Sequence, residues 1–492
     1  MKKDIESPFS RDSAATARWF ISGLLAVAFS SCVPTVEPKT VDAPLPDSFG
    51  TSSDPNNSAT VEWKEVFKDP NLLALIDTAL KNNQELNIFL QEIEVAKNEV
   101  LTRSGAYLPF VDLGGAAGLD KTADFTRSGA VEQNLPISPG KAFPGRLPNF
   151  IVGARASWEI DIWHKLRDAE KSAISRFIAT QEGQRFLVTN LISEVANSYY
   201  ELRAFDSQLE IVKQNVAIQT NALDTIRLEK DAARVTELAV RRFEAQLLKT
   251  ESLQYDLQQK IFERENKLNF LLGRFPQPVQ RVGEAFVSSM PQMISAGIPS
   301  QLLENRPDIR QAELEITAAE LDTKVARAAF YPSLNLSAEV GYEAYRLGKI
   351  LQTPESLLYS IAGGLTGPLI NRRAITADLY TANARQIQAA FNYERTVLNA
   401  FVESTNQISN IKNLESSVSL RMKQVEALTS SIGIANTLFT SARADYTEVL
   451  LTQREAIESK FELIEAKMRQ MQAVVNLYRA LGGGWTREKE KV

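Results

Sequence analysis

The chain has 492 residues, and its 55 basic and 60 acidic side chains nearly cancel, to a formal net charge of -5. This balance gives no basic surface for nucleic acid, and we expect no nucleic-acid partner. The single cysteine, Cys32, and the single histidine, His164, exclude disulfides within the chain and the usual cysteine and histidine metal clusters. Composition alone does not exclude a site built from carboxylate side chains.

The N-terminus has the pattern of an export signal. Basic residues come first, and an apolar run from Trp19 to Phe29 follows, which is shorter than the roughly 20 residues that a membrane-spanning helix needs. We predict a signal peptide at residues 1–31. Cys32 after two serines resembles the lipobox of bacterial lipoproteins, whose cysteine is acylated, although Phe29 stands where leucine is usual. The alternative is an unmodified cysteine near the cleavage point.

Residues 32–60 are rich in Pro, Ser, Thr and Asp and are predicted to be a flexible, lipidated tether. The rest of the chain is built twice. One constant offset relates the sequence around Pro109 to that around Pro332, and a second relates Asn190 to Asn399 and Gly273 to Gly482. We predict a first structural repeat at residues 61–280, a second at 281–484, and a C-terminal tail at 485–492.

Each repeat shows the pattern helix, strand, loop, strand, long helix, long helix. In the first repeat the strands are expected at about 107–121 and 149–160, around a Pro-, Gly- and Ser-rich loop at 122–148. In the second repeat they are expected at about 331–345 and 357–366, around a shorter loop. His164 falls between a strand and a helix, and we expect a structural role for it there.

The helices carry heptad seams, in which apolar residues alternate at spacings of three and four. The first seam is broken only by Ser198 and Gln219, and no proline interrupts the chain from Lys165 to about Lys230. A continuous helix there would be on the order of 100 Å long, which no compact globule contains. The seams consist of Leu191, Val195, Leu202, Phe205, Leu209, Val212, Val216, Leu223 and Ile226; of Val397, Phe401, Ile408, Ile411, Val418, Met422, Val425 and Ile432; and of Ile457, Phe461, Ile464, Met468, Met471, Val475 and Tyr478.

Four strands cannot form a closed barrel on their own. Membrane barrels need about eight strands or more, and an open sheet edge is not tolerated in lipid. The chain is therefore expected to oligomerise, and its long hairpins would pack against copies of themselves as a hollow cylinder. The predicted fold class is mainly α with a small β part, in which a long α-helical coiled-coil barrel continues a transmembrane β-barrel to which each protomer gives four strands.

Two motifs resemble the TolC family of outer-membrane efflux proteins, specifically the lipoprotein branch that serves resistance-nodulation-division pumps. The motifs are Arg306-Pro307-Asp308-Ile309-Arg310 and the ending Leu481-Gly482-Gly483-Gly484-Trp485. The resemblance implies a homotrimer, lipid-anchored and barrel-inserted in the cell outer membrane and extending into the periplasm. It also implies a periplasmic membrane-fusion adaptor and an inner-membrane transporter as partners, and neither enzymatic activity nor a cofactor. Pro307 and Asp308 by themselves predict a helix cap.

The resemblance further implies gating by the tips of the helical hairpins, here at about 230–240 and 439–451. Thr447 and Leu451 match the positions at which relatives carry an acidic and an apolar ring, so the acidic ring is missing at its usual place. Glu448 and Asp445 are candidate substitutes, with a solvated helix face as the alternative for both. Glu237 in the first tip is a further candidate.

Three functions fit these patterns. They are an exit duct for drugs or other small toxic compounds, the duct of a type I protein-secretion system, and a structural periplasmic coiled coil or adaptor. Glycine-rich strands and the internal duplication argue against the third. The lipobox-like cysteine and the glycine-rich ending favour the first over the second, by family resemblance.

Overall fold

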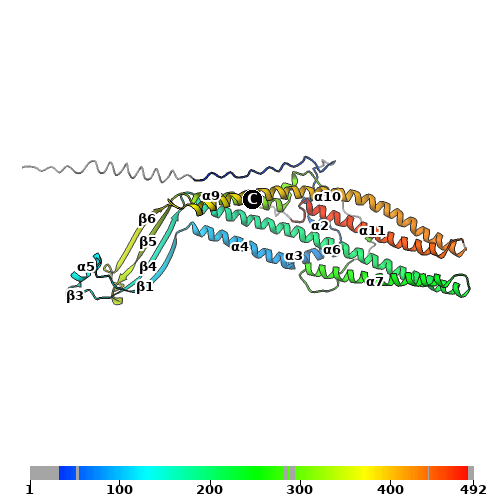
Figure 1. Ribbon diagram of the computed structural model, residues 1–492, viewed down its shortest axis with the longest axis horizontal. Helices are drawn as coiled ribbons and strands as arrows, with labels where there is room; N and C mark the ends of the chain where they lie inside the picture. Colours follow the sequence, from blue (N-terminus) through cyan, green and yellow to red (C-terminus); the bar gives the residue numbers. More distant parts are fainter. Residues whose placement is uncertain (1–32, 51–54, 282–285, 289–293, 442, 486–492) are drawn as a thin grey trace, which may run out of the picture. The chain divides into compact units, whose positions relative to one another are not determined.

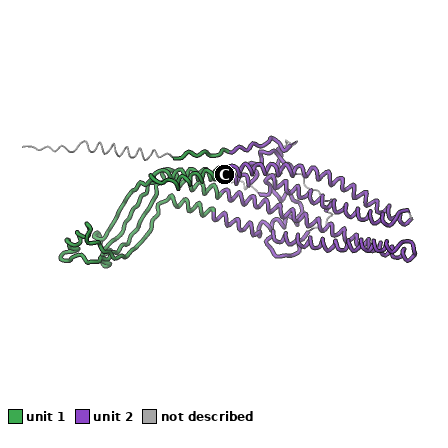
Figure 2. The backbone as a smooth tube through the Cα atoms, in the orientation of Figure 1, with its two compact units in different colours: residues 1–40, 96–177, 315–389 green, residues 41–95, 178–314, 390–492 purple. Residues whose placement is uncertain are grey.

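A computed structural model describes residues 33–50, 55–281, 286–288, 294–441 and 443–485 (Figure 1). The predicted signal peptide, the predicted acylation at Cys32 and residues 486–492 of the predicted tail lie outside the described residues. The chain divides into two compact units, each assembled from three stretches of sequence (Figure 2). Unit 1 consists of residues 1–40, 96–177 and 315–389, and unit 2 of residues 41–95, 178–314 and 390–492.

The fold is mainly helical with a small β part, as predicted. The first half of the described chain contains η1 (Ser58–Thr60), α2 (Trp63–Val66), α3 (Pro70–Asn82), α4 (Gln84–Ala106), β1 (Phe110–Asp120), α5 (Arg127–Asn134), β2 (Pro136–Ser138), β3 (Lys141–Ala142), β4 (Leu147–Ile160), α6 (Lys165–Asp231) and α7 (Glu237–Leu271). The second half contains η2 (Phe286–Ser288), α8 (Gln301–Asn305), α9 (Pro307–Ala328), β5 (Ser333–Ala344), η3 (Leu347–Lys349), β6 (Leu357–Thr366), α10 (Arg373–Thr440) and α11 (Tyr446–Ala480).

Unit 1 is organised around an antiparallel sheet with strand order β1-β4-β5-β6, and each of the four predicted strands is present. The segment at 122–148, predicted as a loop, holds α5 and the small β2–β3 hairpin instead. Thr126 caps α5 by accepting the N–H of Gly129, a local signal that the Pro- and Gly-rich composition concealed. At the centre of the sheet Gly153 faces Gly341, and a Cβ on either would lie within 2.6 Å of a backbone oxygen on the neighbouring strand.

The two faces of this sheet differ in polarity. Side chains alternate between faces along each strand, and the register keeps this alternation in phase across all four strands. One face carries Val111, Leu113, Leu119, Val152, Trp158, Ile160, Leu334, Leu336, Val340, Tyr342, Leu357, Tyr359, Ile361 and Leu365. The other carries all the charged side chains of the four strands, and with them four large apolar ones: Asp112, Asp120, Asn149, Arg155, Glu159, Asn335, Glu339 and Glu343, and Phe110, Leu147, Ile151 and Leu358.

The passage from β4 into α6 is fixed by two residues. Asp161 is buried, and its carboxylate accepts the N–H groups of Leu166 at 3.1 Å and Arg167 at 3.0 Å, which caps the first turn of α6. His164 has a φ of 58°, in the left-handed region that histidine enters more readily than most residues. The structural role expected for His164 at a junction between strand and helix is therefore confirmed.

The long helices follow the predicted seams. Helix α6 has 67 residues, as expected for an unbroken rod, and Val195, Leu202 and Val212 along its seam are fully buried. The seam on α11 is likewise buried or half-buried throughout. Met422, which was assigned to the seam on α10, is 51 % exposed in the single chain. Within the described residues, none of the helices combines the length and the apolar character needed to cross a membrane.

Polar positions of the first seam are buried as well. Ser198 and Gln219 interrupt the apolar pattern in the sequence, yet both are nearly inaccessible. The amide of Gln219 has no hydrogen-bond partner within the described structure. The seam therefore continues through both polar residues, as polar layers inside coiled coils do.

The segment predicted as a flexible tether is held at several points. In unit 1, the side-chain amide of Gln386 makes two hydrogen bonds of 2.9 Å, to the backbone N–H and the carbonyl of Lys39. In unit 2, Phe49 is buried and stacks on Phe401 with ring centroids 5.7 Å apart. The composition of this segment gave no sign of these contacts, because their partners lie more than 300 residues further along the chain.

Candidate functional site

The first hairpin tip joins α6 to α7 through residues 232–236. Helix α6 ends with Ala233 in the left-handed region, at a φ of 55°, and the N–H of Arg234 donates to the carbonyl of Glu229 at 2.8 Å. This hydrogen bond closes the last turn in the manner of a Schellman cap. Glu237 begins α7 and receives salt bridges of 2.9 Å from both Lys230 and Arg241.

The second hairpin tip joins α10 to α11 with the same backbone device. Here the N–H of Arg443 donates to the carbonyl of Leu438 at 2.9 Å, at the position related to Arg234 by the offset between the repeats. Asp445 is the N-cap of α11 and accepts the N–H of Tyr446 at 3.0 Å. Both turns fall inside the ranges predicted for the tips.

An apolar cluster packs the two tips together within unit 2. The buried residues of this tip cluster come from the first hairpin, and the half-buried ones come from both. The cluster consists of Leu223, Ile226, Ala239, Val240 and Phe243, with Ala222, Val235, Leu247, Phe439, Tyr446 and Leu450 packed against them. The ends of the two hairpins are thereby coupled, so a displacement of one is opposed by the other.

The predicted aperture residues lie on the exposed side of the second tip. Thr447, Glu448 and Leu451 are exposed on the first turns of α11, whereas their neighbours Val449 and Leu450 are turned into the protein. Leu451 is 44 % exposed. Asp445 is exposed too, but its carboxylate is engaged in capping α11.

Electrostatics distinguish Glu237 from the other candidates. The hydrogen bond from Lys230, followed by the charges of Lys230 and Arg241, holds the pKa of Glu237 below its usual value. The same pair raises the pKa of Lys230. Glu237 therefore acts as the ionised centre of a small network that ties the end of α6 to the start of α7.

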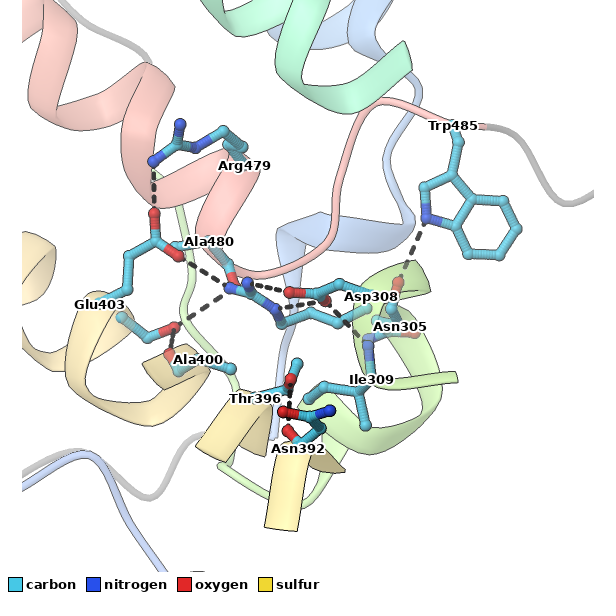
Figure 3. A network of polar contacts seen from close by, with 12 residues as sticks. Asn305, Asp308, Ile309, Asn392, Thr396, Ala400, Glu403, Arg479, Ala480 and Trp485 are labelled. Atoms are coloured by element: carbon cyan, nitrogen blue, oxygen red, sulfur yellow. Dashed lines mark hydrogen bonds and ion pairs between the residues drawn. The ribbon is translucent and has the colours of Figure 1, made fainter. Parts of the chain in front are cut away.

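The Arg306-Pro307-Asp308 motif does more than cap a helix. Pro307 starts α9 as predicted, and Asp308 accepts the N–H of Ile309 at 3.0 Å. Arg306 is 5 % exposed, and its guanidinium bonds both oxygens of Asp308, Glu403 on α10 at 3.0 Å, and the carbonyl of Ala480 at the end of α11 at 2.7 Å (Figure 3). A buried arginine thus joins three helices of unit 2.

The glycine-rich ending meets this network. Gly482 has a φ of 88°, and a Cβ there would lie 2.4 Å from the carbonyl oxygen of Asn305. Trp485 donates from its indole Nε1 to that carbonyl at 3.2 Å, and Arg479 pairs with Glu403 (Figure 3). The two sequence motifs that carried the family resemblance are therefore parts of one structure, which the sequence alone did not reveal.

Comparison with known proteins decides the family. Residues 75–274 and 298–483 match the family described as outer membrane efflux protein. The chain belongs to this family. It is 27 % identical to the solvent efflux pump outer membrane protein SrpC of Pseudomonas putida, in an alignment of 471 positions that covers 94 % of this chain and 97 % of the relative. It is 26 % identical to the cation efflux system protein CusC of Escherichia coli, again over 94 % of this chain and 97 % of the relative.

Solved structures share the fold of this efflux protein. A membrane protein from Pseudomonas aeruginosa superposes with a TM-score of 0.82 at 24 % identity, covering 92 % of this chain and 99 % of that one. The open state of the MtrE outer membrane channel of Neisseria gonorrhoeae gives a TM-score of 0.81 at 22 % identity, covering 94 % and 100 %. The protein is therefore an outer membrane efflux protein with the fold of these solved structures.

Proposed function

We propose that three copies of this efflux protein assemble into one gated duct, through which small molecules pass from the periplasm or cytoplasm to the exterior. The observation that carries this proposal is the sheet of unit 1. Its edge strands β1 and β6 each pair on one side within the chain, and one face is apolar across all four strands. Copies that continue the sheet into a closed ring would satisfy both edges and turn the apolar face to lipid.

The exposed side chains support this orientation of the sheet. Leu113 on β1 is 86 % exposed and Ile361 on β6 is 84 % exposed, and both belong to the apolar face. The opposite face carries carboxylates and the salt bridge between Arg155 and Glu339 at 3.2 Å. In a closed barrel the apolar face would meet lipid on the outside, and the charged face would meet water on the inside.

The hairpin tips supply the gate in this proposal. Leu451 and Thr447 lie on the exposed side of α11, where copies related by symmetry would present them to a common axis. Leu451 would form an apolar ring that narrows the aperture. Glu448 and Asp445 lie in the same turn, and Glu237 marks the first tip, so the charge at the aperture comes from these three carboxylates.

The N-terminus anchors the duct. Acylation of Cys32 would place lipid at the start of the segment that Gln386 holds through Lys39.

The boundaries of the two repeats, 61–280 and 281–484, belong to this proposal too, since the element order from α4 to α7 recurs from α9 to α11. In this proposal the barrier to free diffusion of small molecules through the duct is set by the assembled copies rather than by one chain.

The proposed partners are a periplasmic membrane-fusion adaptor and an inner-membrane resistance-nodulation-division transporter. Relatives named for the efflux of solvent and cations, and for the export of pyoverdine by Pseudomonas aeruginosa, favour small-molecule cargo over a protein-secretion duct. We propose no catalytic step for this chain. A strain without the protein should accumulate small organic compounds and keep its level of secreted proteins, and the reverse result would favour the secretion duct.

A matched pair of substitutions on β1 tests the duct itself. Leu113→Arg puts a charge on the apolar face, and Ala116→Arg puts the same charge on the opposite face of the same strand. Arginine facing the middle of a bilayer costs about 2–4 kcal/mol. We expect Leu113→Arg to abolish assembly in the outer-membrane fraction and conductance in planar bilayers, while Ala116→Arg keeps both. Equal behaviour of the two variants would overturn the proposed orientation.

A further inference from the structure

A groove of about 450 Å³ opens in unit 1 where strands pass into helices. It lies between the link from β4 to α6 and the end of α9, just before β5. Its lining includes Trp163, Asp168, Lys171, Lys324, Arg327 and Tyr331. Neither the apertures nor the buried arginine network involves these residues.

The aromatic wall of the groove is rigid. The rings of Trp163 and Tyr331 stack with centroids 4.8 Å apart and an interplanar angle of 26°. The indole Nε1 of Trp163 donates to the carbonyl of Pro332 at 2.8 Å, which fixes the ring against the start of β5. Tryptophan and tyrosine gather at the level of lipid headgroups, because each joins an apolar ring to a polar atom.

The groove also carries cations, on α9 and on α6. Lys324 and Arg327 are three residues apart on α9, so they share a helix face, and both are exposed. Neither side chain has an ion pair or a hydrogen bond within the described structure. Lys171 on α6 adds a third cation, although Asp168 contacts it at 3.4 Å. Three cations against one carboxylate leave the groove with an excess of positive charge.

The N-terminal segment reaches the same cations. A neighbouring pocket of about 280 Å³ is lined by Val36 and Pro38 together with Lys324, Arg327 and one carboxylate, Glu320. Cys32 precedes Val36 by four residues, so the chain can separate them by no more than about 14 Å. An acyl chain on Cys32 would therefore enter the membrane close to Lys324 and Arg327.

We propose that this groove binds the phosphate of an anionic phospholipid from the periplasmic leaflet of the outer membrane. Lys324 and Arg327 hold the phosphate, Lys171 adds to the positive potential, and Trp163 and Tyr331 flank the glycerol region. The proposal rests on the proposed placement of the sheet in the bilayer, since that placement puts the ends of β4 and β5 at headgroup level.

Native mass spectrometry of the purified, delipidated full-length protein in detergent tests the site. The probes are phosphatidylglycerol, phosphatidylcholine and sodium phosphate. Wild type should bind phosphatidylglycerol about tenfold more tightly than phosphatidylcholine, and the double variant Lys324→Gln with Arg327→Gln should lose this preference. The charge-conserving variant Lys324→Arg with Arg327→Lys should keep it.

The matched control is Lys249→Gln with Lys423→Gln, which removes two exposed lysines from α7 and α10 in unit 2. This control should bind phosphatidylglycerol like wild type. Oligomeric state in the same spectra and conductance in bilayers should be unchanged in every variant, which separates failure of this site from failure of the duct. Equal phosphatidylglycerol binding by wild type and the glutamine double variant would overturn the proposal, as would displacement of the lipid by sodium phosphate.

Discussion

Arg306 and Ala480 are 174 residues apart in the sequence, and a hydrogen bond of 2.7 Å joins the guanidinium of the first to the carbonyl of the second. Ala480 is the last residue of α11, so its carbonyl has no acceptor role inside the helix. The same guanidinium also bonds Asp308 and Glu403. The beginning of α9 and the end of α11 are thereby held to one point on α10.

Removal of this arginine should destabilise unit 2 strongly. Arg306→Leu removes the ion-pair partner of Asp308 and leaves Glu403 with Arg479 alone, and breaking a buried pair costs about 3–5 kcal/mol. Urea denaturation of the purified protein measures the loss in the free energy of unfolding. Arg454→Leu is the control, because Arg454 is half-exposed and lies 3.9 Å from Glu458, a pair worth less than about 1 kcal/mol. Equal losses in both variants would refute the role assigned to Arg306.

The first hairpin tip should show a defined response to pH. The folded pKa of Glu237 is lowered, so its contribution to stability is complete above the usual glutamate pKa of about 4.3 and is lost as pH falls through the lower, folded value. Amide protection near residues 229–241, corrected for intrinsic exchange, should stay constant from neutral pH to about pH 5 and fall only in stronger acid.

Glutamine at position 237 should lower that protection already at neutral pH, since it removes both salt bridges. The control is Glu448→Gln, which alters an exposed carboxylate in the first turn of α11. If hydrogen exchange at the first tip is the same in wild type and Glu237→Gln, the network around Lys230 does not hold the turn.

The aperture should respond to the size and charge of residue 451. Leu451→Ala removes apolar packing between copies and should raise the leak conductance in planar bilayers. Leu451→Asp should create a ring of like charges that favours cations, and this preference should weaken as ionic strength rises. Leu420→Ala, at an exposed leucine on α10, is the control. If neither substitution at residue 451 alters the conductance, the constriction lies instead at Asp445, Glu448 or Glu237.

Acylation at Cys32 can be tested directly in cells. Wild type should incorporate radiolabelled palmitate, and Cys32→Ser should not. The substitution should weaken anchoring without unfolding the protein, because the cores of unit 2 lie elsewhere in the chain. Equal labelling of the two proteins would show that Cys32 is not the acylated residue.

The sequence predicted what local patterns determine. The seam through Val195, Leu202 and Val212 was correct because burial follows the heptad spacing. The seam on α10 is less completely buried in the single chain, where Met422 is 51 % exposed. The strands were correct because alternation is a local signal. The contacts of Arg306 were beyond prediction from one sequence, since Glu403 and Ala480 become its neighbours only when α10 and α11 fold back.

The central claim is that one chain is a third of a closed outer-membrane duct. The most direct measurement is the native mass of the full-length protein extracted from outer membranes in mild detergent. The account predicts a single species with the mass of three mature chains, which dissociates only when the helices unfold. A stable monomer that keeps its native helix content and conducts ions in planar bilayers would contradict it.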